Sequence, residues 1–288
     1  MFGSSIPCKA PWCPTRDVAG AFPASRGTRV NKRQDEAFVL GTTELGEADL
    51  IVTLLTERHG KVRAVARAAR RSRRRFGGWL EPLTWVRASW AEREGRDLQR
   101  LDDVEGVRSF AAMQAEPLRQ AACAVLADVA AGFAREGQTD PEEFRLVAAV
   151  LDALERGDPP RPLLRYFEYW TLRVHGLLPA LDACVICGRT LSPDGSVRVS
   201  AGRGPLCAGC PRLAGEQIAT LRPVDRAFLE AARRLPPTAL SDPAHGLRCG
   251  AALETFLRGT IEAFAERTFR TYRHFKAAEG LSADGVPS

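Results

Sequence analysis

The sequence predicts a multidomain α+β protein in which a small β-barrel comes first and a mainly α-helical region follows. Two observations predict this order. Short runs of β-forming residues fill the segment 34–107, and after Pro117 apolar residues recur at helical spacing. A third observation is that two Cys-x-x-Cys pairs interrupt the helical part. A chain of 288 residues is long enough for two or three such units.

Five runs of residues predict the strands of the barrel. They are 38–40, 50–55, 62–65, 83–90 and 98–107. Gly60 lies between the second and third runs, where it can supply the positive φ of a tight hairpin turn. Five short strands in about seventy residues suit a closed barrel such as the OB-fold, because closure leaves no sheet edge exposed. An SH3-like barrel fits the same pattern.

Four helical segments are expected after the barrel. Their apolar stripes cover residues 118–133, 144–154 and 163–177, and a last stripe that starts at Leu253 is expected to continue past Phe269. Prolines mark the start of the third helix. We interpret these stripes as faces that pack in a core, because apolar residues at helical spacing need only a facing helix.

The predicted domain boundaries follow these changes of pattern. Residues 1–31 are interpreted as a disordered extension or a misassigned start, because the first patterned segment begins near Lys32. Residues 32–108 form the predicted barrel domain, and residues 109–288 form the helical domain, with a cysteine-bearing insert at 181–213. No segment has the run of about eighteen apolar residues that a membrane helix needs, and no signal-peptide pattern is found. A cytoplasmic protein without membrane contact is therefore expected.

Four cysteines in the insert have the spacing of a metal site. They are Cys184, Cys187, Cys207 and Cys210, which form two pairs separated by nineteen residues. Two residues between the cysteines of a pair allow both thiolates to face one ion, and Gly188 and Gly209 suit the tight turns. Between the pairs we predict a β-hairpin, with its turn at Pro193-Asp194-Gly195 and a strand at 196–199.

This ligand set predicts one structural Zn²⁺ ion. Because four thiolates complete the coordination sphere, no open position is left for a substrate or an activated water. The alternatives are two disulfides or a thiol redox site, although a redox site needs only one pair at a helix start. Cys123 and Cys249 lie in apolar helical patterns and are expected to be buried without a role, and Cys8 and Cys13 are interpreted as stray residues of the N-terminal extension.

The net charge of +6 is concentrated in one basic run between Arg58 and Glu81. Its cationic residues are Lys61, Arg63, Arg67, Arg70, Arg71, Arg73, Arg74 and Arg75. Arginine suits phosphate oxygens and can stack on unpaired bases. Since the run starts on a predicted strand and continues into the next loop, we predict that it binds nucleic acid on one face of the barrel, with Phe76 and Trp79 as stacking surfaces. The alternative is a solvated basic loop or a localisation signal.

No pattern in the chain predicts catalysis. The sequence shows no nucleophile paired with a base, no paired carboxylates and no phosphate-binding loop. Its histidines, His59, His175, His245 and His274, are scattered. We expect His59 in a turn beside the basic strand and His175 at a helix end. The chain is therefore predicted to be a binding protein and not an enzyme.

Three motifs flank the basic run. They are Glu47-Ala48-Asp49-Leu50, Thr56-Glu57-Arg58-His59-Gly60-Lys61 and Leu80-Glu81-Pro82-Leu83. Their order resembles the amino-terminal barrel of the RecO family, in which residues 66–72 would occupy the cationic stretch. The helical continuation and the four-cysteine insert are similar too, so the resemblance extends from Gln34 to the carboxyl end. Ala68 stands where the family commonly has a glycine, and this is expected to stiffen the turn before the basic loop.

The resemblance implies a mediator of DNA repair and homologous recombination. Members of this family bind single- and double-stranded DNA, engage the single-stranded-DNA-binding protein, anneal complementary strands and, with RecR, help to load the RecA recombinase. The resemblance also implies an OB-fold for the barrel and a location in the bacterial cytoplasm or nucleoid. The alternative from another class is an RNA-binding or transcription-associated zinc protein. Titration of single-stranded DNA against structured RNA, together with a strand-annealing assay, distinguishes the two.

Overall fold

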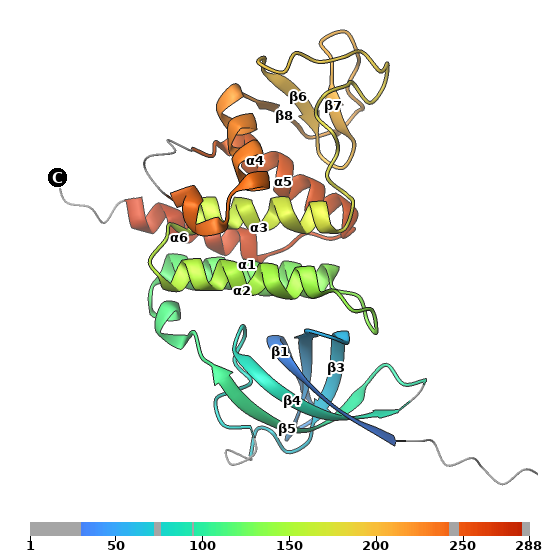
Figure 1. Ribbon diagram of the computed structural model, residues 1–288, viewed down its shortest axis with the longest axis vertical. Helices are drawn as coiled ribbons and strands as arrows, with labels where there is room; N and C mark the ends of the chain where they lie inside the picture. The colour runs from blue at the N-terminus through green and yellow to red at the C-terminus, as the bar shows by residue number, and fades with distance from the viewer. Residues whose placement is uncertain (1–29, 72–75, 94, 242–247, 284–288) are drawn as a thin grey trace, which may run out of the picture.

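The structure is a computed structural model that describes residues 30–71, 76–93, 95–241 and 248–283. Along its longest axis a β-barrel forms one end, stacked helices the middle and a small sheet the other end (Figure 1). This arrangement confirms the predicted fold class. The predicted N-terminal extension lies outside the described residues up to residue 29, as does His245, whereas residues 30 and 31 belong to the first strand.

Five strands close the barrel: β1 (Val30–Leu45), β2 (Asp49–Thr56), β3 (Gly60–Ala66), β4 (Trp85–Arg93) and β5 (Gln99–Arg108). They are hydrogen-bonded in the order β1-β2-β3-β5-β4, and β4 pairs with β1 to complete the ring. Every pair is antiparallel except β3 with β5, which is parallel. Of the two barrels considered, this is the OB type. The order brings β3 beside a strand that is distant in the sequence.

The alternation of side chains along β3 separates its apolar residues from its cations. Val62, Ala64 and Ala66 are buried in the barrel core. Lys61 and Arg63 are only half-buried and lie on the outer face, because successive side chains of a strand point to opposite faces. The barrel therefore closes on an apolar core while the basic residues of β3 remain on its outer surface.

The helical region contains α1 (Pro117–Phe133), α2 (Pro141–Glu155), α3 (Pro160–Val174), α4 (Pro223–Arg234), α5 (Ala251–Phe264) and α6 (Thr271–Ala283), with 3-10 helices η1 (Ala111–Ala115) and η2 (Pro237–Ser241). Helices α1 to α4 each begin with a proline, whose missing N–H is not needed in a first turn. Figure 1 shows α1 and α2 next to the barrel, and α4 and α5 toward the small sheet. In the described ranges, no helix combines the length and apolarity that crossing a bilayer requires.

The small sheet contains β6 (Val197–Ser200), β7 (Gly204–Leu206) and β8 (Ile218–Leu221), in the order β7-β6-β8. The strand predicted at 196–199 corresponds to β6. The turn predicted at Pro193-Asp194-Gly195 is wrong, because this segment precedes β6 and does not join two strands. Residues 201–203 join β6 to β7 instead, and Gly202 supplies the positive φ of +75° there.

The last predicted helix is also divided in two. Helix α5 ends at Phe264, and α6 begins at Thr271, so the expected continuation past Phe269 is wrong. Glu266 has a φ of +52°, which breaks the helix, and Phe269 is fully buried in the core. The break allows the chain to reverse so that α6 packs along α1. The packing of α6 against α1 therefore decides where α5 ends, although the apolar pattern of the sequence continues past that point.

One end of the barrel shares a hydrophobic core with the helices. Phe38 of β1 lies 4.8 Å from the ring of Phe144 in α2 and 5.2 Å from the ring of Trp85 in β4, measured between centroids. Leu55 and Leu83 of the barrel region belong to the same cluster of buried side chains as the helices. The second, smaller cluster fills the inside of the barrel. One end of the barrel is therefore fixed against α1 and α2.

The turn between β2 and β3 sits directly on the α1–α2 loop. Gly60 has a φ of +65°, and a Cβ at this position would lie 2.0 Å from the carbonyl oxygen of Gln138. The N–H of Lys61 donates to the carbonyl oxygen of Arg135 at 2.9 Å, and the hydroxyl of Thr139 donates to the carbonyl oxygen of Arg58 at 2.7 Å. Only glycine allows this close approach.

A buried carboxylate holds the same turn from the barrel side. Asp35 accepts hydrogen bonds from the backbone N–H of Arg58 at 2.8 Å and from its guanidinium at 3.0 Å, and lies 2.8 Å from Nδ1 of His59. Burial alone raises the pKa of Asp35, but the hydrogen bonds from His59 and Arg58 outweigh it, so that the pKa is lowered. His59 is thus a turn residue with a structural partner.

Ala68 follows β3 in a strained conformation. Its φ is +55°, a value that glycine adopts without cost and alanine does not. Its N–H donates to Oδ1 of Asp49 at 2.7 Å, which holds the turn in place. The effect that alanine has on this turn is therefore backbone strain.

Replacing Gly60 should disturb the junction between barrel and helices. We expect Gly60→Ala to lower the free energy of unfolding by about 3 kcal/mol or more, because the new Cβ meets backbone atoms in addition to the strained φ. Gly46→Ala is the matched control, since Gly46 has the same φ of +65° but no atom within 4 Å of its Cβ position. The Gly46→Ala variant should lower the free energy of unfolding by only about 1 kcal/mol. Equal losses in urea denaturation would show that the contact with Gln138 is unimportant.

Replacing Ala68 by glycine should relieve strain. We expect Ala68→Gly to raise the free energy of unfolding by about 0.5–1 kcal/mol, because the relief exceeds the added entropy of the unfolded chain. Ala69→Gly, at a neighbouring position without positive φ, should instead lower it. Chemical denaturation of both variants measures the difference, and a destabilised Ala68→Gly would contradict the strain.

Candidate nucleic-acid interface and metal site

The described residues of the predicted basic run lie at two places on the barrel. Lys61 and Arg63 lie on the outer face of β3, and the turn after β3 carries the exposed Arg67, Arg70 and Arg71. The predicted binding residues Arg73, Arg74 and Arg75 lie outside the described residues.

Lys61 lies apart from the exposed arginines of the turn after β3, namely Arg67, Arg70 and Arg71. It lies at the end of β3 that meets the helices, and its Nζ donates to the carbonyl oxygen of Ala131 in α1 at 3.3 Å. Arg67 follows the other end of the strand. Because a strand advances about 3.3 Å per residue, the two side chains are well apart. The geometry gives Lys61 a place in the junction and leaves the turn after β3 as the exposed basic surface.

A hollow of about 520 Å³ brings Arg67 together with three further arginines. They are Arg93 at the end of β4, Arg96 in the β4–β5 turn and Arg100 on β5. The parallel pairing of β3 with β5 places Val65 opposite Arg100 and so forms one wall. We call this hollow the arginine groove.

The charge of the arginine groove is positive. Four guanidinium groups and one carboxylate, that of Asp49, line it, and the carboxylate already accepts the N–H of Ala68. Exposed ion pairs join arginines in and near the groove to neighbouring acids, namely Arg70 to Glu44 (3.4 Å), Arg71 to Glu47 (3.7 Å) and Arg100 to Asp102 (2.7 Å). Exposed pairs contribute about 0–1 kcal/mol, so phosphate oxygens can replace these carboxylates at little cost.

Sequence reasoning missed Arg93, Arg96 and Arg100. In the sequence they are dispersed among acidic residues and form no run. Their approach to Arg67 depends on the β3–β5 pairing, which is not local. The available signal was the recurrence of arginine around Gly95, in a turn between two predicted strands.

The expected stacking surfaces need correction. Phe76 is fully buried in the barrel core and cannot stack on a base, so this prediction is wrong. Its apolar ring completes the core of the small barrel. Because burial of a large apolar ring is favourable, Phe76 packs in this core although it follows the basic run in the sequence. Trp79 is 37% exposed. Its indole covers the backbone of Gly106, where a Cβ would lie 2.3 Å from the ring, so much of one face is occupied.

The four predicted cysteines meet in the small-sheet region. The sulfur atoms of Cys184, Cys187, Cys207 and Cys210 all lie within 4.8 Å of one another. Each pair forms a tight turn: the N–H of Gly188 donates to the carbonyl oxygen of Cys184 at 2.9 Å, and the N–H of Cys210 to that of Cys207 at 3.3 Å. All four thiols are free. The cluster is a candidate metal site.

The thiols of this cluster influence each other's ionisation. Hydrogen bonds from the backbone of Cys207 and Cys187 lower the pKa of Cys184 to about 6. The pKa of Cys210 is raised to about 12, chiefly by its hydrogen bonds with Cys207 and Cys187. Of these two thiols, Cys184 therefore loses its proton more readily than Cys210. A tetrahedral divalent ion bound by the four sulfur atoms would favour their thiolate forms.

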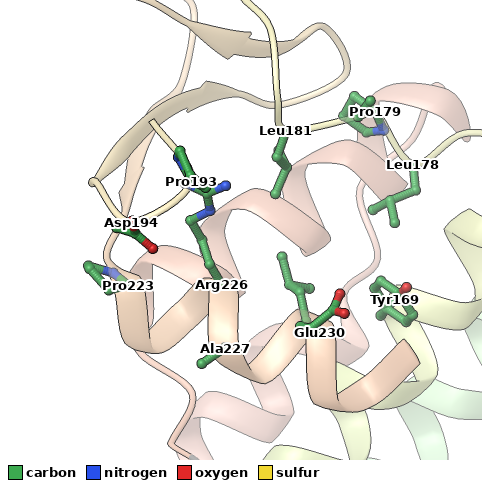
Figure 2. Close-up of a pocket in the computed structure, with 12 residues that line it drawn as sticks. Tyr169, Leu178, Pro179, Leu181, Pro193, Asp194, Pro223, Arg226, Ala227 and Glu230 are labelled. Atoms are coloured by element: carbon green, nitrogen blue, oxygen red, sulfur yellow. The ribbon is translucent and has the colours of Figure 1, made fainter. Parts of the chain in front are cut away.

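A second hollow lies between the cysteine region and α4. It measures about 600 Å³ and lies between the segment 178–194 and the exposed side of α4 (Figure 2). Arg226 extends from α4 toward Pro193 in Figure 2, and its Nη1 donates to the carbonyl oxygens of Ser192 at 2.6 Å and Gly195 at 3.3 Å. The guanidinium is thus used to hold the cysteine region on the helices. In Figure 1 this region lies at the end of the molecule opposite the barrel.

Two family models and several related proteins match most of the chain. The family model described as "Recombination protein O N terminal" matches residues 31–110, and that described as "Recombination protein O C terminal" matches residues 114–266. The "DNA repair protein RecO" of Anaeromyxobacter sp. (strain K) is 45% identical over 229 residues, which are 76% of this chain and 87% of that protein. The protein of the same name from Myxococcus xanthus (strain DK1622) is 34% identical over 224 residues, which are 76% of this chain and 90% of that protein.

Proposed function

The chain belongs to the RecO family of DNA repair and recombination proteins, and from this premise we propose that it binds single- and double-stranded DNA through the arginine groove. The observation that carries the proposal is the convergence of Arg67, Arg93, Arg96 and Arg100 on one hollow of an OB-type barrel. Barrels of this type bind nucleic acid strands along a positively charged face. We assign the DNA contact to the barrel domain, residues 32–108, including the arginines of the basic run from Arg63 to Arg75, and leave Lys61 to the junction with the helices.

Contact with phosphate explains why DNA binding is expected to be independent of base sequence and sensitive to salt. Guanidinium groups that neutralise phosphates bind without regard to base sequence and release counterions, so that affinity falls as salt rises. A strand held by its phosphates keeps its bases free to pair. Partial neutralisation of its charge also reduces the repulsion that a complementary strand meets. Binding and strand annealing thus follow from the same surface, and neither requires a covalent step.

The protein partners are assigned to the rest of the molecule. We propose that the helical domain, residues 109–288, contacts RecR and the single-stranded-DNA-binding protein, and that these contacts support the loading of RecA. What supports this division is the distance between the arginine groove and the cysteine region, which lie at opposite ends of the molecule (Figure 1). A strand in the groove therefore leaves the helical surfaces free.

For the cysteine cluster we propose one structural Zn²⁺ ion. Four sulfur ligands fill a tetrahedral coordination sphere, so the ion would act in folding and not in catalysis. The insert at 181–213 has little core of its own, and a metal compensates for this. Arg226 of α4 then holds the insert directly, and β8, which pairs with β6 of the insert, contacts α5.

The salt dependence of binding tests the arginine groove. If about four phosphates are neutralised, the slope of log affinity for a single strand against log salt should be near −3, at about 0.7 per phosphate. The double variant Arg96→Gln/Arg100→Gln should make this slope shallower by about 1.4. The control Arg233→Gln/Arg234→Gln removes the same charge from α4 and should leave the slope unchanged. An equal change in both variants would mean that the groove has no special role.

Metal analysis and melting test the structural role of zinc. We expect one zinc per chain to survive gel filtration, and Cys184→Ser to lose it and to melt at a lower temperature, because metal binding is coupled to folding. DNA affinity below the melting transition should change by less than about twofold, since this site is remote from the arginine groove. Cys249→Ser, outside the cluster, should keep its zinc. Weak DNA binding together with normal melting in Cys184→Ser would contradict the assignment, as would reactive thiols without metal.

An annealing assay tests the proposed function as a whole. Complementary oligonucleotides coated with single-stranded-DNA-binding protein should anneal faster when the chain is present, and the Arg96→Gln/Arg100→Gln variant should accelerate annealing less. With uncoated strands, where no protein partner is present, the control variant on α4 should accelerate annealing as much as the parent. No acceleration of annealing, or binding to structured RNA in preference to single-stranded DNA, would overturn the proposal.

A further inference from the structure

A second group of potential metal ligands lies where α1, α2 and α3 meet the barrel. Asp140 caps the N-terminus of α2, Glu143 lies in the first turn of α2, and His175 caps the C-terminus of α3. One ligand atom of each residue lies within 4.8 Å of the others. None of the three belongs to the arginine groove or to the cysteine cluster.

Glu143 is the unusual member of this group. The residue is 1% exposed, and neither of its carboxylate oxygens has a hydrogen-bond partner. Nε2 of His175 is also buried without a hydrogen bond, although it lies 3.4 Å from Oε2 of Glu143. Leaving a buried carboxylate unsatisfied is costly. Apart from this contact with each other, the two groups have no hydrogen-bond partner among the described residues.

The surrounding charges do not supply that partner. The charge of Lys61 acts on Glu143, but its Nζ donates to the carbonyl oxygen of Ala131. Arg135 also lines the adjoining hollow, and its Nη1 lies 3.4 Å from Oε1 of Gln138. Burial raises the pKa of Glu143, and His175 only partly offsets this. A cation between the carboxylates and the imidazole would stabilise the charged form.

We propose that Asp140, Glu143 and His175 bind a divalent first-row metal ion. One imidazole nitrogen and two carboxylate oxygens are a ligand set that Zn²⁺ and Mn²⁺ accept. Oδ1 of Asp140 accepts the N–H of Glu143 at 3.1 Å, which leaves Oδ2 for the ion. Since the ligand atoms lie within 4.8 Å of one another, adjustment of the side chains can bring them to bonds of about 2.0–2.2 Å with one ion. The hollow of about 500 Å³ that Asp140 and His175 line gives water access to the remaining positions.

The location indicates what the ion would do. The loop that ends at Asp140 is the one that receives the β2–β3 turn, through Arg135, Gln138 and Thr139. An ion held by Asp140 and His175 ties this loop to the end of α3. Binding would therefore stiffen the junction between the barrel and the helices. This inference does not depend on the proposed DNA contact.

Mn²⁺ is the probe for this site, because hard cations do not compete for the four thiolates. Titration of the zinc-loaded full chain, followed by the loss of the free Mn²⁺ signal in electron paramagnetic resonance, should show one bound Mn²⁺ per chain. Asp140→Asn should weaken binding at least about tenfold while keeping the helix cap, since asparagine caps as well as aspartate. His175→Gln should weaken it similarly.

The controls separate ligation from folding. Glu142→Gln removes an exposed carboxylate from the same turn and should change the affinity less than about twofold. Mn²⁺ should raise the melting temperature of the parent chain and of Glu142→Gln but not that of Asp140→Asn, and circular dichroism checks that each variant is folded. Zn²⁺ should displace the bound Mn²⁺, since it binds such sites more tightly. Absence of Mn²⁺ binding, or equal binding by folded Asp140→Asn and His175→Gln, overturns the proposal.

Discussion

The contact between the β2–β3 turn and the α1–α2 loop is the constraint on which the rest of the structure depends. Gly60 allows the turn to approach the carbonyl oxygen of Gln138, and buried Asp35 holds the turn from the barrel side. Strand β3 starts at this contact, so its direction is set there. Its far end, with Arg67, necessarily points away from the helices. The position of the arginine groove is thus a consequence of how the barrel is attached.

The attachment also explains the division between the two ends of the molecule. Helices α1 to α6 separate the barrel from the small sheet with its four cysteines (Figure 1). The guanidinium of Arg226 connects the cysteine region to α4, so a metal bound there would stabilise the helical part first. The sequence alone placed the basic run and the cysteines far apart along the chain. The fold shows that they are also far apart in space.

Local patterns in the sequence predicted most of the fold. The five strands, α1 to α3 and the cysteine cluster all depend on short spacings, and the structure contains each of them. Features that depend on distant contacts were not predicted. The burial of Phe76, the break between α5 and α6 and the joining of Arg67 to Arg100 all require partners from elsewhere in the chain. The approach of His175 to Glu143 is a further case, because two helices bring them together.

The central claim is that DNA lies against β3 and β5 and not against the cysteines. Hydrogen–deuterium exchange of the full chain, with and without a single-stranded oligonucleotide, tests it most directly. The account predicts slower exchange of the backbone amides in residues 61–71 and 91–101, and no change in residues 184–210. Protection centred on residues 184–210, with residues 61–71 and 91–101 unaffected, would contradict it.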